Sequence, residues 1–97
     1  MIGPNLPGNV FTQLSINQNA PTVSGVYAIY NSTQWIYIGE GQDIGDRLLK
    51  HLNGDNPRIT RANPAGFQFE AVPAHLRVAR QDELILRLHP VANQRLG

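Results

Sequence analysis

The feature that most constrains the fold is a pair of short runs, GVYAIY at 25–30 and WIYIG at 35–39, both rich in β-branched and aromatic residues. Such residues favour β-strands. The four residues between the runs, NSTQ at 31–34, are typical of turns. Two strands that are joined by so short a link form an antiparallel hairpin. We therefore expect a small sheet built around this hairpin.

An amphipathic helix is expected directly after the hairpin. Asp43 is a favourable N-cap, and Gly54 is a typical residue for the end of a helix. Between them an apolar residue recurs every four positions, at Ile44, Leu48 and Leu52. This spacing gives the helix one apolar stripe, which we expect to pack on the sheet.

The rest of the chain predicts one more strand and one more helix. Residues 54–66 read as a loop with one short helical turn, 67–72 as a strand, and 74–88 as a long helix that is apolar around much of its girth and therefore well buried. We expect residues 1–24 to form a mostly irregular arm that packs on a domain formed by residues 25–97. The order β-β-α-β-α predicts an α+β fold, with a small three-stranded antiparallel sheet flanked by helices.

Composition excludes several classes of protein. A chain of 97 residues has room for one hydrophobic core, and no run approaches 18 apolar residues. The first ten residues do not resemble a secretory signal. The absence of cysteine from the sequence excludes disulfides, thiolate catalysis and zinc held by sulfur. We therefore expect a cytoplasmic or nucleoid-associated protein that does not enter a membrane.

The basic residues are almost all arginine. Seven of the eight are Arg and one is Lys50, while the formal net charge is only +1. Arginine suits forked contacts to phosphate, but ordinary solvated surfaces also carry it. Arg47 and His51 are four residues apart, so they form a row beside the apolar stripe. They therefore project where the helix meets the sheet, and not straight into solvent.

The two strand-like runs contain GVY at 25–27 and YIG at 37–39, with nine residues between the tripeptides. They resemble the two signature tripeptides of the GIY-YIG nuclease superfamily. Arg47 lies ten residues after Tyr37, where that family places its catalytic arginine, and His51 stands one helical turn later, where many members have His or Tyr. A tripeptide alone is a weak signal, whereas several positions in the right order on the expected elements are a strong one.

The similarity continues towards the end of the chain. Glu83 resembles the metal-binding glutamate of the family, and Pro90 with Asn93 resembles its closing P-x-x-N segment. One difference is Val26, another β-branched residue, in place of the isoleucine in the first tripeptide. The matching positions thus extend from 25 to 93.

The resemblance implies a divalent-metal-dependent endonuclease, a small standalone catalytic domain that hydrolyses DNA phosphodiester bonds. Glu83 would bind one Mg²⁺ or Mn²⁺ ion, because a carboxylate is a hard oxygen ligand. Arg47 would supply a fork to the scissile phosphate. Tyr27 is assigned as the general base and Tyr37 as the group that orients water or phosphate, and these two roles are exchangeable. His51 would take or relay a proton, or contact the phosphate.

Structural alternatives stand beside these assignments. Glu83 has Arg80 and Arg87 as partners on its own helix, and Arg47 has acidic residues on its helix. Asn93 suits a structural role in which its amide holds the end of the chain. The resemblance assigns substrate binding to Gly39, Lys50 and Asn93.

A second class of function stays open, namely a non-catalytic nucleic-acid-binding or assembly module that keeps the nuclease fold. Retention of Arg47 and Glu83 favours the enzyme, because the fold itself requires neither charge. In the enzyme, the hydroxyls of Tyr27 and Tyr37 should line one concave pocket with that guanidinium and that carboxylate. Target specificity would come from DNA structure or from a recruiting protein partner, in DNA repair or recombination. RNA as the substrate, the role of residues 1–24 and the oligomeric state stay open.

Overall fold

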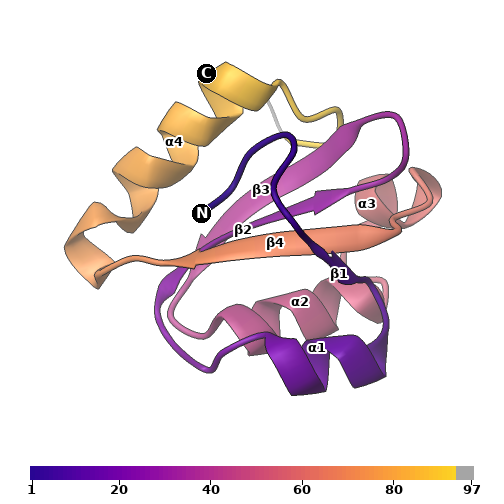
Figure 1. Ribbon diagram of the computed structural model, residues 1–97, viewed down its shortest axis with the longest axis horizontal. Helices are drawn as coiled ribbons and strands as arrows, with labels where there is room; N and C mark the ends of the chain where they lie inside the picture. The colour runs from indigo at the N-terminus through magenta and orange to yellow at the C-terminus, as the bar shows by residue number, and fades with distance from the viewer. Residues whose placement is uncertain (94–97) are drawn as a thin grey trace.

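The hairpin is part of one antiparallel sheet in the computed structural model, which describes residues 1–93 (Figure 1). In chain order the elements are β1 (Asn9–Val10), α1 (Gln13–Asn19), β2 (Gly25–Tyr30), β3 (Trp35–Gly41), α2 (Ile44–Leu52), α3 (Pro57–Arg61), β4 (Gly66–Ala71), the 3₁₀ turn η1 (Ala74–Leu76) and α4 (Arg77–Leu88). The strands lie in the order β1-β4-β2-β3. β2 is therefore central, with β3 on one side and β4 on the other. Residues 94–97, which end the expected domain, lie outside the described part of the chain.

The α+β class is confirmed, but the expectation of a three-stranded sheet is wrong, and the element order β-β-α-β-α is not confirmed, because β1, α1 and α3 are additional elements. Residues 1–24 are more regular than expected, since Asn9 and Val10 pair with β4 and add a fourth strand. Helix α1 follows, capped by the side chain of Thr12 and anchored by buried Ile16. A strand of two residues is too short to show an alternating pattern, and its partner strand lies far along the chain. Strand β1 could therefore not be recognised from its local sequence.

The sheet separates two hydrophobic clusters, with α1 and α2 over one face and α4 over the other (Figure 1). Successive residues of β2 point to opposite faces. Tyr27 and Ile29 enter the cluster under α2, whereas Val26 and Ala28 enter the cluster under α4. All four are 0% exposed. Because β2 is covered on both faces, the position of Tyr27 is held by packing from above and below the sheet.

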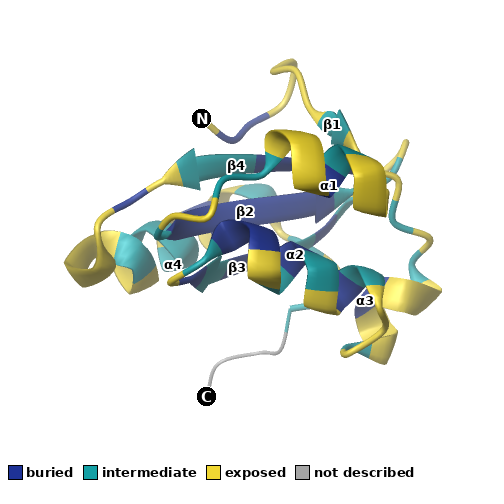
Figure 2. Ribbon diagram, turned by 90° about the horizontal axis from the view of Figure 1, so that it is seen from below, coloured by how far each residue is buried: buried dark blue, intermediate teal, exposed yellow. Residues whose placement is uncertain are grey.

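Helix α4 is not the well-buried helix that the sequence predicts. Residues 74–88 divide into η1 and α4, and Leu84 is the one residue of α4 that is fully buried. Val78 and Leu86 are 57% and 75% exposed. The helix forms an outer layer, so one stripe packs on the sheet and the opposite stripe faces outward (Figure 2). None of the described helices combines the length and the apolar character needed to cross a membrane.

Candidate active site

Four of the predicted site residues meet on the α2 side of the sheet. The rings of Tyr27 on β2 and Tyr37 on β3 have centroids 6.3 Å apart. The His51 ring, from α2, has its centroid 5.5 Å from that of Tyr27 and 5.1 Å from that of Tyr37. Arg47 lies close enough for its positive charge to act on both tyrosine hydroxyls. The structure thus brings together side chains from two strands and a helix.

Two glycines of β3 make room for this arrangement. Tyr27 lies opposite Gly39 in the hairpin register. A Cβ atom at Gly39 would overlap the Tyr27 hydroxyl, and a Cβ atom at Gly41 would lie 2.7 Å from Cγ of Arg47. Gly39, assigned to substrate binding from the sequence, therefore has a packing function in the structure, because any side chain there would displace Tyr27.

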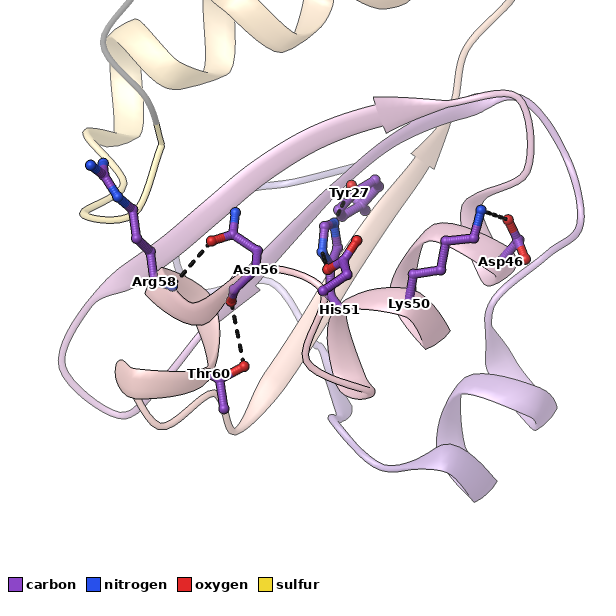
Figure 3. Close-up of polar contacts among 8 residues, drawn as sticks. Tyr27, Asp46, Lys50, His51, Asn56, Arg58 and Thr60 are labelled. Carbon is purple, nitrogen blue, oxygen red and sulfur yellow. Dashed lines mark hydrogen bonds and ion pairs between the residues drawn. The ribbon is translucent and has the colours of Figure 1, made fainter.

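A chain of hydrogen bonds links a buried hydroxyl to the surface. Tyr27 Oη lies 2.7 Å from Nε2 of His51 (Figure 3), and Nδ1 of His51 lies 2.8 Å from Oδ1 of Asp55. Tyr27 and His51 are 0% and 3% exposed, whereas 40% of the Asp55 side chain is exposed. We call the five residues that these contacts bring together the polar cluster: Tyr27, Tyr37, Arg47, His51 and Asp55.

Asp55 is the member that the sequence analysis missed. Gly54 has a φ of 89°, and the N–H groups of Gly54 and Asp55 donate to the carbonyls of His51 at 3.1 Å and Lys50 at 3.2 Å. This is the pattern of a Schellman motif, which turns the chain back over the last turn of the helix. The stretch HLNGD at 51–55 carries the signal, because a glycine just after a helix returns the next residue towards that turn.

Burial decides the protonation of the polar cluster. It raises the pKa of both Tyr27 and Tyr37, and the charge of Arg47 opposes this only in part. Burial also lowers the pKa of His51, against the hydrogen bond and the charge of Asp55. At neutral pH both tyrosines therefore keep their protons and His51 is neutral. Neither tyrosine is the phenolate that a strong general base requires.

Glu83 does not join the polar cluster. It lies on the exposed side of α4, over the opposite face of the sheet, and its carboxylate accepts a 2.7 Å hydrogen bond from Arg80, which lowers the pKa of Glu83. Arg80 also donates two bonds of 2.9 and 3.0 Å to Glu70 on β4. The structure thus shows the ion pair that was the alternative to metal binding. Among the described residues, the expected pocket shared by Glu83 and the tyrosines is not formed.

The two other predicted substrate contacts have partners of their own. Nζ of Lys50 lies 3.2 Å from Oδ2 of Asp46, with both side chains about half exposed (Figure 3). The Asn93 amide accepts from the N–H of Ile38 at 2.9 Å and donates to its carbonyl at 2.8 Å, as a neighbouring strand would. Asn93 therefore holds the end of the described chain against the edge of β3.

Two other carboxylates act on the tyrosines. Burial is the main cause of the raised pKa of Tyr37, and the charge of Arg47 opposes it. The charges of Asp55 and Glu40 raise that pKa further. Glu40 follows Tyr37 by three residues on β3, is 28% exposed, and accepts a 2.7 Å hydrogen bond from Arg77 of α4. No group of three or more His, Cys, Asp or Glu side chains within residues 1–93 could hold a metal ion. A cation near Tyr37 would therefore have few protein ligands. Glu40 is a suitable oxygen ligand whose charge reaches Tyr37. It pairs with Val26 in the hairpin register, so its side chain points to the α4 face of the sheet and not to the polar cluster.

A separate cavity of about 330 Å³ lies between the N-terminal residues and the turn of the hairpin, and Asn5, Tyr30 and Trp35 are among the residues that line it. None of the predicted site residues lines this cavity. It therefore has no part in the candidate site.

Known proteins resemble the chain over the same region. The family model of the GIY-YIG catalytic domain matches residues 23–86. Solved structures of the GIY-YIG N-terminal endonuclease domain of UvrC from Thermotoga maritima are also similar. Two of them are point mutants bound to a catalytic divalent cation, with 26% and 24% identity and TM-scores of 0.70 and 0.71, and a third is bound to magnesium, with 25% identity and a TM-score of 0.70. These similarities cover 82%, 82% and 81% of this chain and 96% of each UvrC domain. No curated protein matches the sequence.

Proposed function

This chain belongs to the family of GIY-YIG catalytic domains, and from that premise we propose that it is an endonuclease that hydrolyses phosphodiester bonds of DNA. The observation that carries the proposal is the polar cluster. In it, the partly exposed Arg47 and Tyr37 lie against Tyr27 and His51, which are buried. Partial exposure leaves Arg47 and Tyr37 open to a substrate. Burial holds Tyr27 and His51 in place.

Arg47 is the group proposed to contact the scissile phosphate. Its guanidinium carries a positive charge at every relevant pH, and its forked N–H groups match phosphate oxygens. The transferring phosphoryl group carries more negative charge in the transition state than in the bound substrate. A donor held in place before the reaction therefore lowers the barrier.

Burial favours an exchange of the roles that the sequence assigned to the two tyrosines. Tyr27 is 0% exposed, so a water molecule beside the substrate does not reach it in this structure, whereas Tyr37 is partly exposed. We propose that Tyr37 positions the attacking water and that Tyr27 supports the site from below. Because Tyr37 keeps its proton at neutral pH, it orients the water without being a strong base.

A divalent cation is part of the proposal, since the similar UvrC domains are bound to a catalytic divalent cation, magnesium in one structure. When bound, such an ion lowers the pKa of its water and offsets the charge of the phosphate. We propose one Mg²⁺ or Mn²⁺ ion with Glu40, and not Glu83, as its protein ligand. The Glu40 charge acts on Tyr37, and that of Glu83 does not. Both carboxylates accept a hydrogen bond from an arginine of α4, on the face of the sheet opposite Tyr37.

Replacement of each carboxylate by an amide tests the ligand assignment. Glu40→Gln is expected to raise the Mn²⁺ concentration needed for half-maximal cleavage by at least about tenfold, and by more than Glu83→Gln does. Arg77→Gln breaks the ion pair between Arg77 and Glu40 but keeps the Glu40 carboxylate, so it controls for the loss of that ion pair. Direct Mn²⁺ binding by electron paramagnetic resonance should follow the same order. A larger effect of Glu83→Gln on both measurements would return the ligand role to Glu83.

Nicking of supercoiled plasmid tests the function itself. The wild-type chain is expected to convert the plasmid to nicked and linear forms with Mg²⁺ or Mn²⁺, and EDTA should abolish cleavage, because an essential cation is removed. Branched, flapped and single-stranded DNA, together with RNA, form the substrate panel. Arg47→Ala purified in parallel is the control, since equal cutting by both preparations would reveal a contaminating nuclease.

One observation favours the second candidate function, a nucleic-acid-binding module without activity. The charge of Glu83 was part of the case for catalysis, and that carboxylate is not at the polar cluster. A module of this kind would retard DNA in a gel shift but cut no member of the substrate panel. The nicking assay therefore separates the two candidates.

Target choice is proposed to come from DNA structure or from a recruiting protein partner. A formal net charge of +1 gives the chain little attraction to a polyanion. Binding of the bare domain should therefore be modest and should weaken further with added salt.

A further inference from the structure

We propose that Asp55 is a positioning residue, which sets the direction of the hydrogen-bond chain that runs through His51 and Tyr27 to Arg47. In this way it holds the guanidinium in place from the far side of the cluster. The inference rests on the proposed function, because it takes Arg47 as the phosphate contact.

The chemistry of Asp55 allows one direction only. An ionised carboxylate has no proton and can only accept, so Nδ1 of His51 must donate across the 2.8 Å contact. A neutral imidazole has a single N–H, which leaves Nε2 as an acceptor. Across the 2.7 Å contact the Tyr27 hydroxyl must then donate to His51. The lone pairs of the Tyr27 oxygen remain available to accept from another donor.

We assign Arg47 as that donor. Its positive charge acts on the Tyr27 hydroxyl, and Gly41 leaves space for the stem of Arg47. Because Tyr27 is 0% exposed, its oxygen has a fixed place. Arg47, by contrast, is only partly covered, so an anchor on its buried side limits the directions that its exposed side can take.

The opposite tautomer of His51 would reverse the direction of the hydrogen bond between His51 and Tyr27. If Nε2 of His51 carried the proton, it would donate to the Tyr27 oxygen and compete there with Arg47. The Tyr27 proton would then need a different acceptor in a buried place, where unpaired polar groups are costly. Asp55 prevents this arrangement, and the turn at Gly54 is what brings Asp55 into reach.

The same chain predicts sensitivity to acid. The groups that face His51 are Tyr27, Tyr37, Arg47 and Asp55. Burial lowers the pKa of His51 below its ordinary 6.5, and Asp55 opposes that shift while Arg47 adds to it. Protonated His51 has two donors and no acceptor, so cleavage should fall as pH drops through this lowered pKa. Loss of the Asp55 charge lowers the pKa further, and the fall should then move to lower pH.

The test compares Asp55→Asn with Asp82→Asn, which removes an equal charge from α4 at a residue outside the polar cluster. Asp55→Asn is expected to lower kcat/KM about 10- to 100-fold, as loss of a supporting partner does at other sites, and to shift the acidic fall in cleavage to lower pH. Asp55→Glu should restore part of the activity, because it restores an acceptor-only group. Asp82→Asn should stay within about twofold of wild type, since surface changes of this kind are small.

Nitrogen-15 NMR of the histidine rings supplies a readout that does not depend on activity. The chain has three histidines, and the His51 signals are those that disappear in His51→Gln. Wild-type His51 is expected to carry its proton on Nδ1. In Asp55→Asn the amide can donate to Nδ1, so the proton should move towards Nε2.

The outcomes separate this inference from the proposed function. Full cleavage by Asp55→Asn beside an active wild type, or an Nε2–H tautomer in wild-type His51, would overturn the positioning role. If the wild type cuts no nucleic acid, the proposed function fails, and the wild-type tautomer still decides the direction of the chain. If circular dichroism shows that Asp55→Asn is unfolded, the wild-type tautomer and Asp55→Glu decide it.

Discussion

Arg47→Ala is expected to lower kcat for DNA cleavage by about 10³-fold, since removal of one preorganised charged donor from a transition state costs about that much. The fold should remain, because Arg47 is partly exposed and Tyr27 keeps its bond to His51. Single-turnover cleavage of labelled DNA measures the change, and circular dichroism checks the fold.

Two further variants separate the geometry of Arg47 from its charge. Arg47→Lys keeps the charge but loses the fork, so it should recover only a small part of the rate. Arg58→Ala removes the same charge from α3, whose residue 58 is exposed, and controls for weaker attraction to DNA. Equal losses in Arg47→Ala and Arg58→Ala would contradict a specific contact with the phosphate.

The second large effect is expected at the tyrosines, where one hydroxyl is removed at a time. Tyr37→Phe should lower kcat by about 10²-fold and leave the free energy of unfolding nearly unchanged, because its hydroxyl positions water. Tyr27→Phe should lower both quantities. Nε2 of buried His51 loses its partner, which costs about 1–3 kcal/mol, and Arg47 loses its anchor. Denaturant unfolding and single-turnover cleavage measure the two effects.

Tyr30→Phe is the matched control, since Tyr30 lies on the same strand as Tyr27 and its ring packs against Trp35, away from the polar cluster. It should leave kcat within about twofold of the wild-type value, as a change outside the site does. The opposite pattern, with Tyr27→Phe inactive but fully stable and Tyr37→Phe active, would restore Tyr27 as the general base.

The parts of the fold that the sequence predicted are those that depend on local rules. The hairpin followed from residue preference and a short turn, and α2 followed from an N-cap, a four-residue apolar repeat and a terminal glycine. The same rules explain why Tyr27, Tyr37, Arg47 and His51 could be placed near one another before the structure was known. Strand β1 followed none of these rules, because two residues have no pattern and pair with a strand far along the chain.

The sequence by itself determined the family, the hairpin and the face of α2 that meets it, because register and helical period depend on neighbouring residues. Only the tertiary structure decided that Glu83 lies away from the tyrosines. Each step along a helix turns the side chain by about 100°, so once Leu84 packs against the sheet, Glu83 beside it is turned aside. Packing across the sheet sets the rotation of α4 about its axis. By contrast, one local turn at Gly54 brings Asp55 within hydrogen-bonding distance of His51.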